Sequence, residues 1–265
     1  MKTEIINKKL GNILNDKTSG SLDLLLKVNN IIKNNYENQK VVNKIIDSIQ
    51  NPLNEFQIIN KYLNHIRKLN NGSNRSKLKS YLNTYFDDIL NQNDIIFDKL
   101  KKLINGKNSI LTLSNSKTVS EILKRYASEN KKLKIFISES RPQNEGRILA
   151  KSFLNAGIKC ELILDAMLPH FIPKVDAAII GADIILKNGN VINKIGSLNA
   201  AILCKYNKKP FYVIASKEKI SNQTSFKTVH KNSAEVWNYS NKKLKINNFY
   251  FEEIDKKLIS KIITN

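Results

Sequence analysis

The spacing of apolar residues changes once along the chain, near the polar segment 105–108, and this change limits the folds that the chain can adopt. From residue 22 to about residue 103, apolar side chains recur every three or four positions, which is typical of amphipathic helices around one core. Ser21 and Asp23 are capping candidates at the start of this region, and 71–74 has the composition of a break. We therefore expect roughly three to five helices between residue 22 and about residue 103.

After residue 106, short apolar runs alternate with segments of helical spacing. Runs that are apolar on both faces are typical of a parallel sheet covered by helices. A hairpin over 184–193, turning at Asn188-Gly189, interrupts the alternation. The expected strands are 110–113, 133–137, 158–164, 177–180 and 211–215. The predicted fold class is α/β, with a helical domain over 1–105 and a Rossmann-like, mostly parallel sheet covered by helices over 106–265.

The charge of the chain favours contact with acidic partners. Lysine and arginine total 44 against 23 acidic residues, a net charge of +21, which attracts polyanions and acidic protein surfaces. The basic residues are spread over the whole length without a block of about five or six like charges, so we expect no direct nucleic-acid binding. Apolar runs are too short for a membrane helix or a signal peptide, and we expect a cytoplasmic protein without membrane contact.

The cysteine, histidine and glycine patterns exclude several site classes. The two cysteines, Cys160 and Cys204, and the three scattered histidines form neither a disulfide framework nor a metal-ligand spacing. The first expected strand is not followed by Gly-x-Gly-x-x-Gly, which argues against a dinucleotide-dependent oxidoreductase. We therefore expect no metal and no cofactor.

Polar residues follow several of the expected strands. Ligands of open α/β sheets bind at the carboxyl ends of the strands. Ser114, Ser116, Lys117 and Thr118 lead into a helix whose first amides favour an anion. Later strand ends and the hairpin supply Arg141, Arg147, Asp183, Asn193 and Lys194. These residues predict a phosphate or sugar-phosphate crevice with one carboxylate; the alternative is that they are only helix caps, turns and ordinary ion pairs, such as Glu139 with Arg141 or Asp183 with Lys194.

Four motifs carry a family resemblance in their order and spacing. They lie at 110–119, 139–147, 181–196 and 210–213, and include Glu139-Ser140-Arg141-Pro142 and Gly181-Ala182-Asp183. This combination resembles the initiation factor 2B regulatory-subunit family, whose superfamily contains the methylthioribose 1-phosphate and ribose 1,5-bisphosphate isomerases. The resemblance covers nearly the whole chain, with 249–264 similar to the closing strand and helix of the family. It implies homo- or hetero-oligomers built largely through the carboxyl-terminal domain.

The superfamily that this chain resembles includes both catalytic and non-catalytic proteins, and individual residues distinguish the two groups. In the isomerases, the loop after the first sheet strand carries a cysteine that works with the aspartate of Gly-Ala-Asp as an acid and base pair. Asp183 matches the aspartate, but Ser114 occupies the cysteine position. A serine without a neighbouring base cannot replace a thiol, and no histidine is an evident partner. The arginine that precedes a glycine in the isomerases is also absent from Thr18-Ser19-Gly20.

The sequence therefore favours a non-catalytic protein that resembles the regulatory subunits, which contact the guanine-nucleotide-binding initiation factor. In this hypothesis the crevice retains a phosphorylated sugar or nucleotide ligand. The alternative is an aldose-ketose isomerase of the ribose 1,5-bisphosphate type, with Asp183 as acid or base and Ser114 in the second catalytic role. The expected ligand-binding residues are Ser116, Lys117, Thr118, Arg141, Arg147, Asn193, Lys194 and Lys219. A bound phosphate is expected between the 115–118 turn, Arg141 and Lys194.

Overall fold

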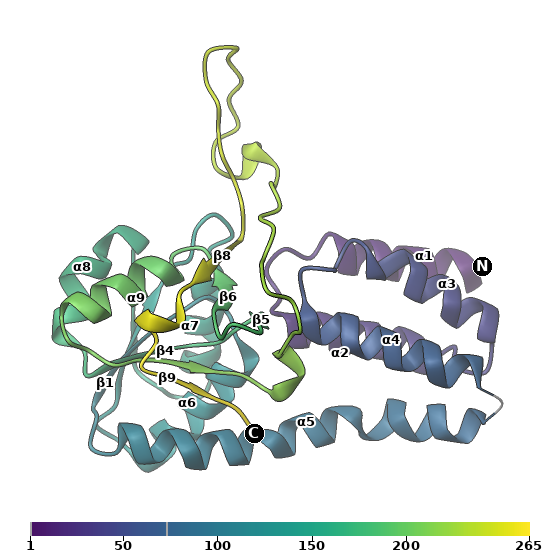
Figure 1. Cartoon of the computed structure of the whole chain (residues 1–265), viewed down its shortest axis with the longest axis horizontal. Helices are drawn as coiled ribbons and strands as arrows, with labels where there is room; N and C mark the ends of the chain where they lie inside the picture. Colours follow the sequence, from purple (N-terminus) through teal and green to yellow (C-terminus); the bar gives the residue numbers. More distant parts are fainter. Residues whose placement is uncertain (1, 73) are drawn as a thin grey trace.

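Helices form the amino-terminal part of the chain in the computed structural model, which describes residues 2–72 and 74–265 (Figure 1). The predicted break is present, because one helix ends at Asn71 and the next begins at Arg75; Ser73 lies outside the described residues. The five helices described there are α1 (Lys2–Leu14), α2 (Ser21–Lys33), α3 (Gln39–Gln50), α4 (Gln57–Asn71) and α5 (Arg75–Ile104). Among the described helices, none is long and apolar enough to cross a membrane.

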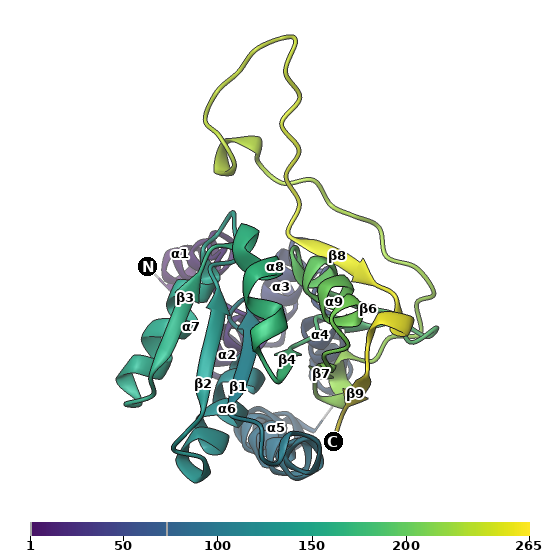
Figure 2. The same cartoon turned by 90° about the vertical axis from the view of Figure 1, so that its left-hand side faces the viewer.

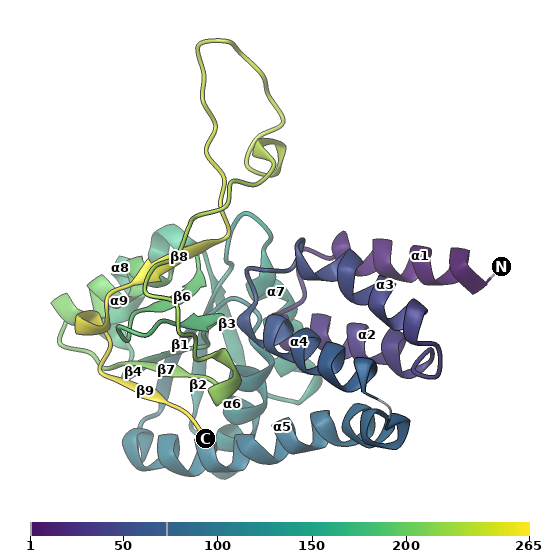
Figure 3. The same cartoon turned by 45° about the vertical axis from the view of Figure 1, so that its right-hand side comes forward.

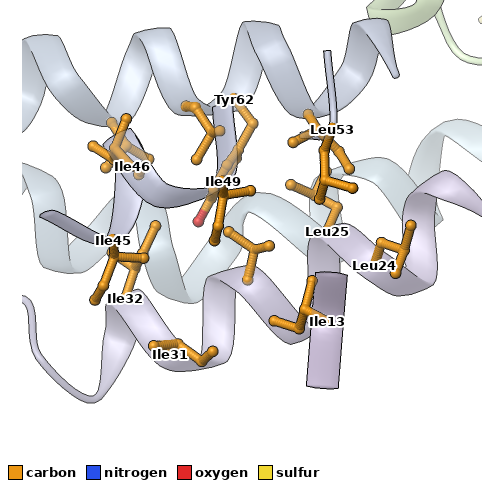
Figure 4. Close-up of a cluster of buried hydrophobic side chains, with 14 of the residues drawn as sticks. Ile13, Leu24, Leu25, Ile31, Ile32, Ile45, Ile46, Ile49, Leu53 and Tyr62 are labelled. Carbon is orange, nitrogen blue, oxygen red and sulfur yellow. The ribbon is translucent and has the colours of Figure 1, made fainter. Parts of the chain in front are cut away.

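The helices pack their apolar faces on one core (Figure 4). Leu25, Ile32, Ile46 and Ile49 are almost completely shielded from solvent, as their three- and four-residue spacing predicts. The capping role expected for Ser21 is wrong. Gly20 is the N-cap of α2 and Ser21 is its first helical residue. The Ser21 hydroxyl caps no backbone amide of α2 and accepts a hydrogen bond from Lys219.

The carboxyl-terminal part is built on a six-stranded sheet in the order β3-β2-β1-β4-β7-β9, with all neighbouring strands parallel (Figure 2). The strands are β1 (Ser109–Leu113), β2 (Lys134–Ser138), β3 (Cys160–Ile163), β4 (Ala177–Ile180), β7 (Phe211–Ile214) and β9 (Lys261–Ile263). Each run expected to be a strand forms one. The predicted α/β fold class is confirmed.

Helices cover both faces of this sheet. Ile110 packs against α6 (Lys117–Glu129), α7 (Glu145–Asn155) and the second half of α5, whereas Leu111 packs against α8 (Leu168–Phe171) and α9 (Ser197–Tyr206). Short 3-10 turns, η1 (Asp165–Met167) and η2 (Ile172–Lys174), flank α8. Successive strand residues face opposite layers, so both must be apolar, which explains the continuous apolar runs in the sequence.

The predicted hairpin forms the start of a second, antiparallel sheet. β5 (Ile184–Ile185) pairs with β6 (Val191–Lys194), and β6 pairs with β8 (Phe251–Ile254). The turn at Asn188-Gly189 is present, with Gly189 at a φ of 88°.

The family resemblance implies a helix at the end of the chain, and this expectation is wrong. The single turn η5 (Lys256–Leu258) is followed by β9, which pairs with β7 at the edge of the main sheet. Ile262 and Ile263 pack in different layers of the core, on opposite faces of the sheet. Neighbouring residues point to opposite faces in a strand but not in a helix, so burial of both isoleucines requires the strand.

Residues 221–249, which we term the arm, connect η3 to β8; both ends of the arm contact the body, and its middle extends away from it as a long loop (Figures 1 and 3). Between β7 and β8, the helical turns of the described chain are η3 (Lys217–Lys219), just before the arm, and η4 (Ser233–Glu235), within it. Trp237 is 57% exposed and stacks on Tyr239, with ring centroids 4.5 Å apart. The arm therefore presents aromatic surface to solvent.

Gly146 is required where α7 begins against β2. A Cβ atom there would lie 1.9 Å from the carbonyl oxygen of Ser138, and backbone on both sides limits relaxation. We expect Gly146→Ala to lower the free energy of unfolding by about 3 kcal/mol, measured by urea denaturation. Gly11→Ala is the control, because Gly11 lies in α1 with open space around it and should gain about 0.5 to 1 kcal/mol. Equal effects of the two substitutions would contradict this account.

Candidate functional site

A cavity of about 220 Å³ lies where the carboxyl ends of β1 and β4 face the helical part of the chain. Its walls come from the α1–α2 connection, the α3–α4 connection, the loops after β1 and β4, and the base of the arm. Gly20 lies so close to the loop after β1 that a Cβ atom would be 2.6 Å from the Asn115 carbonyl oxygen. The cavity is therefore enclosed by both parts of the chain.

The amino-terminal end of α6 forms one wall. Ser116 is the N-cap, and its hydroxyl accepts a hydrogen bond of 3.4 Å from the amide of Val119. Lys117 and Thr118 occupy the first turn, where unpaired amides and the helix dipole favour an anion. The Lys117 ammonium donates to Asp23 of α2 at 3.1 Å, so this lysine also joins the helical part to the sheet.

An ion pair forms another wall. The Lys219 ammonium lies 3.6 Å from Asp183 and donates a hydrogen bond of 2.8 Å to the Ser21 hydroxyl. Burial lowers the pKa of Lys219, and the neighbouring carboxylate of Asp183 opposes that shift. Both side chains line the cavity, so a ligand can contact a carboxylate and an ammonium at once.

A buried network supports the loop after β1 from behind. The Ser114 hydroxyl donates to Glu145 at 2.6 Å, and Lys194 donates to the other carboxylate oxygen at 2.9 Å. The Lys194 side chain is 3% exposed, and its ammonium lies 4.7 Å from the ring centroid of Tyr250. Burial raises the pKa of Glu145, whereas Lys194 and the hydrogen bond from Ser114 favour the ionised carboxylate.

Sequence reasoning missed Glu145 as a site residue, although Glu145 lies within the motif at 139–147. A signal was available in the apolar run that ends at Lys194, since a buried lysine requires a carboxylate partner. The sequence shows no histidine partner for Ser114. In the structure, the carboxylate of Glu145 takes that place and accepts the hydrogen bond of the Ser114 hydroxyl.

The structure brings together most of the residues expected at the site. Lys194 reaches the cavity only through Glu145, whose carboxylate it binds. The expected residues that line the cavity directly are Ser114, Ser116, Lys117, Thr118, Asp183, Asn193 and Lys219. Their roles in binding stay predictions.

The two arginines do not line the cavity. Arg141 donates a hydrogen bond of 3.3 Å to the carbonyl of Val236 in the arm. Arg147 is largely exposed and pairs with Glu139 at 3.1 Å, so the ion pair of Glu139 is with Arg147 rather than Arg141. The sequence predicts a phosphate between the 115–118 turn, Arg141 and Lys194. In the structure, the side chains of Arg141 and Lys194 do not line the cavity beside this turn.

The base of the arm supplies residues that local sequence patterns did not indicate. Lys231 pairs with the buried Glu55 and lies 5.1 Å from the ring centroid of Tyr250. Glu235 accepts hydrogen bonds from Tyr250 and from Lys17 of the α1–α2 connection. These contacts close the cavity between parts of the chain that are far apart in sequence.

Neither cysteine lies at the cavity. Cys204 is buried in α9 beneath the sheet, where burial raises the pKa of its thiol to about 12. Cys160 begins β3 and packs against the other layer. Within residues 2–72 and 74–265, no cluster of three or more His, Cys, Asp or Glu side chains could hold a metal ion.

Comparisons with known proteins agree with the family resemblance. The model of the initiation factor 2 subunit family matches residues 10–265. The chain is 29% identical to ribose 1,5-bisphosphate isomerase of Methanocaldococcus jannaschii, over 76% of this chain and 68% of that protein. It is 39% identical to a putative translation initiation factor eIF-2B subunit 2-like protein of Pyrococcus furiosus, over 48% of this chain and 46% of that protein. The matched segment thus spans about two thirds of the first relative and less than half of the second.

The fold matches solved structures closely. The crystal structure of translation initiation factor eIF-2B from Pyrococcus horikoshii superimposes with a TM-score of 0.84 and 25% identity, covering 98% of this chain and 94% of that one. The resemblance inferred from the four motifs is confirmed.

Removing Lys194 should leave Glu145 as an uncompensated buried charge. We expect Lys194→Met to lower the free energy of unfolding by about 3 to 5 kcal/mol at neutral pH. Burial raises the pKa of Glu145 in the folded protein above its value in the unfolded chain. Between these two pKa values the folded protein keeps a proton that the unfolded chain releases, so the free energy of unfolding falls as the pH rises through this interval. The loss caused by Lys194→Met should therefore be smaller at about pH 5 than at about pH 7.5.

Urea unfolding of the wild type and the variant at both pH values measures this difference. The control is Lys194→Met combined with Glu145→Gln, in which no carboxylate is left unpaired; it should recover much of the lost stability and remove the pH dependence of the difference. A pH-independent loss in the single variant would show that only packing of the lysine matters.

Proposed function

The chain belongs to the initiation factor 2 subunit family, and within it we propose a non-catalytic regulatory subunit of the initiation factor 2B type whose cavity binds a phosphorylated sugar or nucleotide. The observation that carries this proposal is the position of the Ser114 hydroxyl. It donates to the buried Glu145 at the point where the resemblance to the isomerases implies a reactive thiol. Binding groups therefore surround a site in which the Ser114 hydroxyl stands where the isomerases carry their acid and base thiol.

The cavity suits a small anion that also carries hydroxyl groups. The first turn of α6 and the ammonium of Lys219 supply positive potential, and Asp183 can accept a hydrogen bond from a sugar hydroxyl. Ser19 of the α1–α2 connection and Ser21 at the start of α2 add hydroxyl groups to the cavity lining. A volume of about 220 Å³ limits the ligand to a small molecule.

Two features argue against turnover. The Ser114 hydroxyl has a far higher pKa than a thiol, and its proton is directed to Glu145, so it is poorly suited to deliver or remove a proton on a sugar. The α1–α2 connection has no arginine, and its one lysine that lines the cavity, Lys17, is neutralised by Glu235. Strong fixation of a substrate phosphate from this side is therefore missing.

The alternative function is an aldose-ketose isomerase. It is favoured by 29% identity to a ribose 1,5-bisphosphate isomerase and by the retained Asp183, which lies beside Lys219. In that case Asp183 would transfer the proton, and Ser114 with Glu145 would act on the sugar oxygen.

The proposed partners follow from the family and from the surface. A regulatory subunit would contact a guanine-nucleotide-binding initiation factor and would assemble with other copies or other subunits through its carboxyl-terminal domain. The exposed Trp237 and Tyr239 of the arm are surface that such a partner would cover, and the net charge of +21 favours an acidic one.

Binding of phosphorylated compounds tests the proposal. We expect calorimetry to detect saturable binding of at least one of ribose 1,5-bisphosphate, methylthioribose 1-phosphate and adenosine monophosphate. Lys219→Met should weaken it by roughly one to two orders of magnitude, because one charge-assisted contact is lost. Lys151→Met, which removes an exposed lysine of α7, is the matched control and should leave the affinity unchanged. Absence of binding for all three compounds would sink the proposed ligand class.

Turnover separates the two candidate functions. We expect no ketose product from ribose 1,5-bisphosphate or methylthioribose 1-phosphate with the wild type, and no full activity after Ser114→Cys, because the phosphate-holding arginine is absent as well. Product formation is measured by chromatography. Turnover by the wild type that disappears in Asp183→Asn would establish the isomerase instead.

A further inference from the structure

A second cavity, of about 390 Å³, lies at the junction of α4, α5 and the turn η3. We term it the junction cavity. The residues described around it include none that line the first cavity. Its surroundings are unlike the rest of this basic chain, and neither the family match nor the proposed function assigns it a role.

Aromatic rings form the inner wall of the junction cavity. Tyr62 of α4 lies 4.8 Å from Tyr85 of α5 between ring centroids, and Tyr81 lies 5.1 Å from Tyr85. His65 extends this wall, with its ring 4.4 Å from that of Tyr81. Tyrosine faces are electron-rich and attract cations that approach within about 6 Å.

Two carboxylates stand beside these rings without a counter-ion. Glu218 of η3, which is half-buried, and Asp88 of α5, which is exposed, line the junction cavity, and neither forms an ion pair or hydrogen bond within the described part of the chain. Burial and the charges of Glu218 and Asp88 raise the pKa of Tyr81, which agrees with both carboxylates being close to the ring. Lys61 also lines the junction cavity, but its ammonium donates to the backbone carbonyl of Lys217 at 3.4 Å and forms no ion pair with either carboxylate among the described residues.

Two buried polar atoms at the junction cavity also lack partners. The hydroxyl of Tyr85, a residue only 8% exposed, and the side-chain carbonyl oxygen of Gln92 have no hydrogen-bond partner among the residues described. Buried polar groups are almost always hydrogen-bonded, and each exception requires an explanation. An amide oxygen accepts hydrogen bonds, so the missing partner of Gln92 is an N–H or O–H donor.

We propose that the junction cavity is a binding site for a small organic ammonium ion that carries N–H donors, such as a primary amine or diamine. The ammonium would neutralise Glu218 and Asp88 and lie against the faces of Tyr81 and Tyr85. Its N–H groups would donate to the Gln92 oxygen and the Tyr85 hydroxyl.

Other ligand classes fit this cavity less well. An anion would be repelled by the two unpaired carboxylates. A bare metal ion needs several ligands in close contact, and the described residues contain no such cluster. A neutral molecule would leave the half-buried carboxylate of Glu218 without an ion-pair partner.

Calorimetric titration with putrescine at low ionic strength tests the proposal on the full chain. We expect saturable binding with one site per chain, and no saturable binding of 1,4-butanediol, which has a similar length but no charge. Tetramethylammonium carries charge without N–H groups and should bind at least about threefold more weakly than putrescine. Equal binding of the diol, or no binding of putrescine, would overturn the proposal.

Variants locate the binding. Glu218→Gln should weaken putrescine binding by about fivefold or more, and Tyr85→Phe should weaken it by about threefold. Asp98→Asn, the same change at an exposed residue of α5 outside the cavity, should have no effect and serves as the matched control.

The free protein provides a second readout. Because the Tyr85 hydroxyl has no described partner, Tyr85→Phe should unfold at the same urea concentration as the wild type or a higher one. Unchanged putrescine affinity in both Glu218→Gln and Tyr85→Phe would show that the amine binds elsewhere and would refute the assignment.

Discussion

The structure depends on one helix that belongs to two cores. The first half of α5 buries Leu82 and Ile89 in the helical part, and its second half buries Ile96 and Leu100 against the sheet. A continuous helix of 30 residues is about 45 Å long and bends little, so the two parts have little freedom to move relative to each other (Figure 3). This rigidity brings the α1–α2 connection over the carboxyl edge of the sheet, where the first cavity forms.

Electrostatics then determine what this edge can do. In a chain with a net charge of +21, the cavity nevertheless contains balanced pairs, Lys219 with Asp183 on its wall and Lys194 with Glu145 behind it. Buried pairs of this kind contribute little net stability, but losing one partner is costly, so they hold their side chains in defined positions. The neighbouring residue Glu218 faces the junction cavity instead, and the short turn η3 therefore contributes to both cavities.

Retention of a binding site and loss of a reactive group are physically separable. Anion binding depends on helix amides and ammonium groups, and these bind an anion whichever side chains lie beside them. Proton transfer on a sugar depends on two groups with suitable pKa values at one point, so a change of a single residue in the loop after β1 is enough to alter that condition. The same fold can therefore serve both isomerases and regulatory subunits, and the residue after β1 has more influence on the reaction than the fold does.

Local patterns were sufficient for most elements of this protein and for several of the loops that form its site. Apolar spacing predicted the helices between residues 22 and 103, five strands of the main sheet and the hairpin at Asn188-Gly189, because these depend on which faces of a short segment are buried. It did not predict α1 (Lys2–Leu14) or the strand β9. The carboxyl-edge rule likewise predicted that the loops at Ser114 and Asp183 would meet.

Contacts between distant segments were decided only by the tertiary structure. The partners of Arg141 and Glu145, the closure of the cavity by the arm, and the strand in place of a closing helix at Ile262 and Ile263 did not follow from local patterns. The direction of a side chain and the charge it meets depend on segments 198 residues away for Lys219 beside Ser21 and 218 residues away for Lys17 beside Glu235. Sequence spacing within one segment carries no information about such a neighbour, because packing of the whole chain determines it.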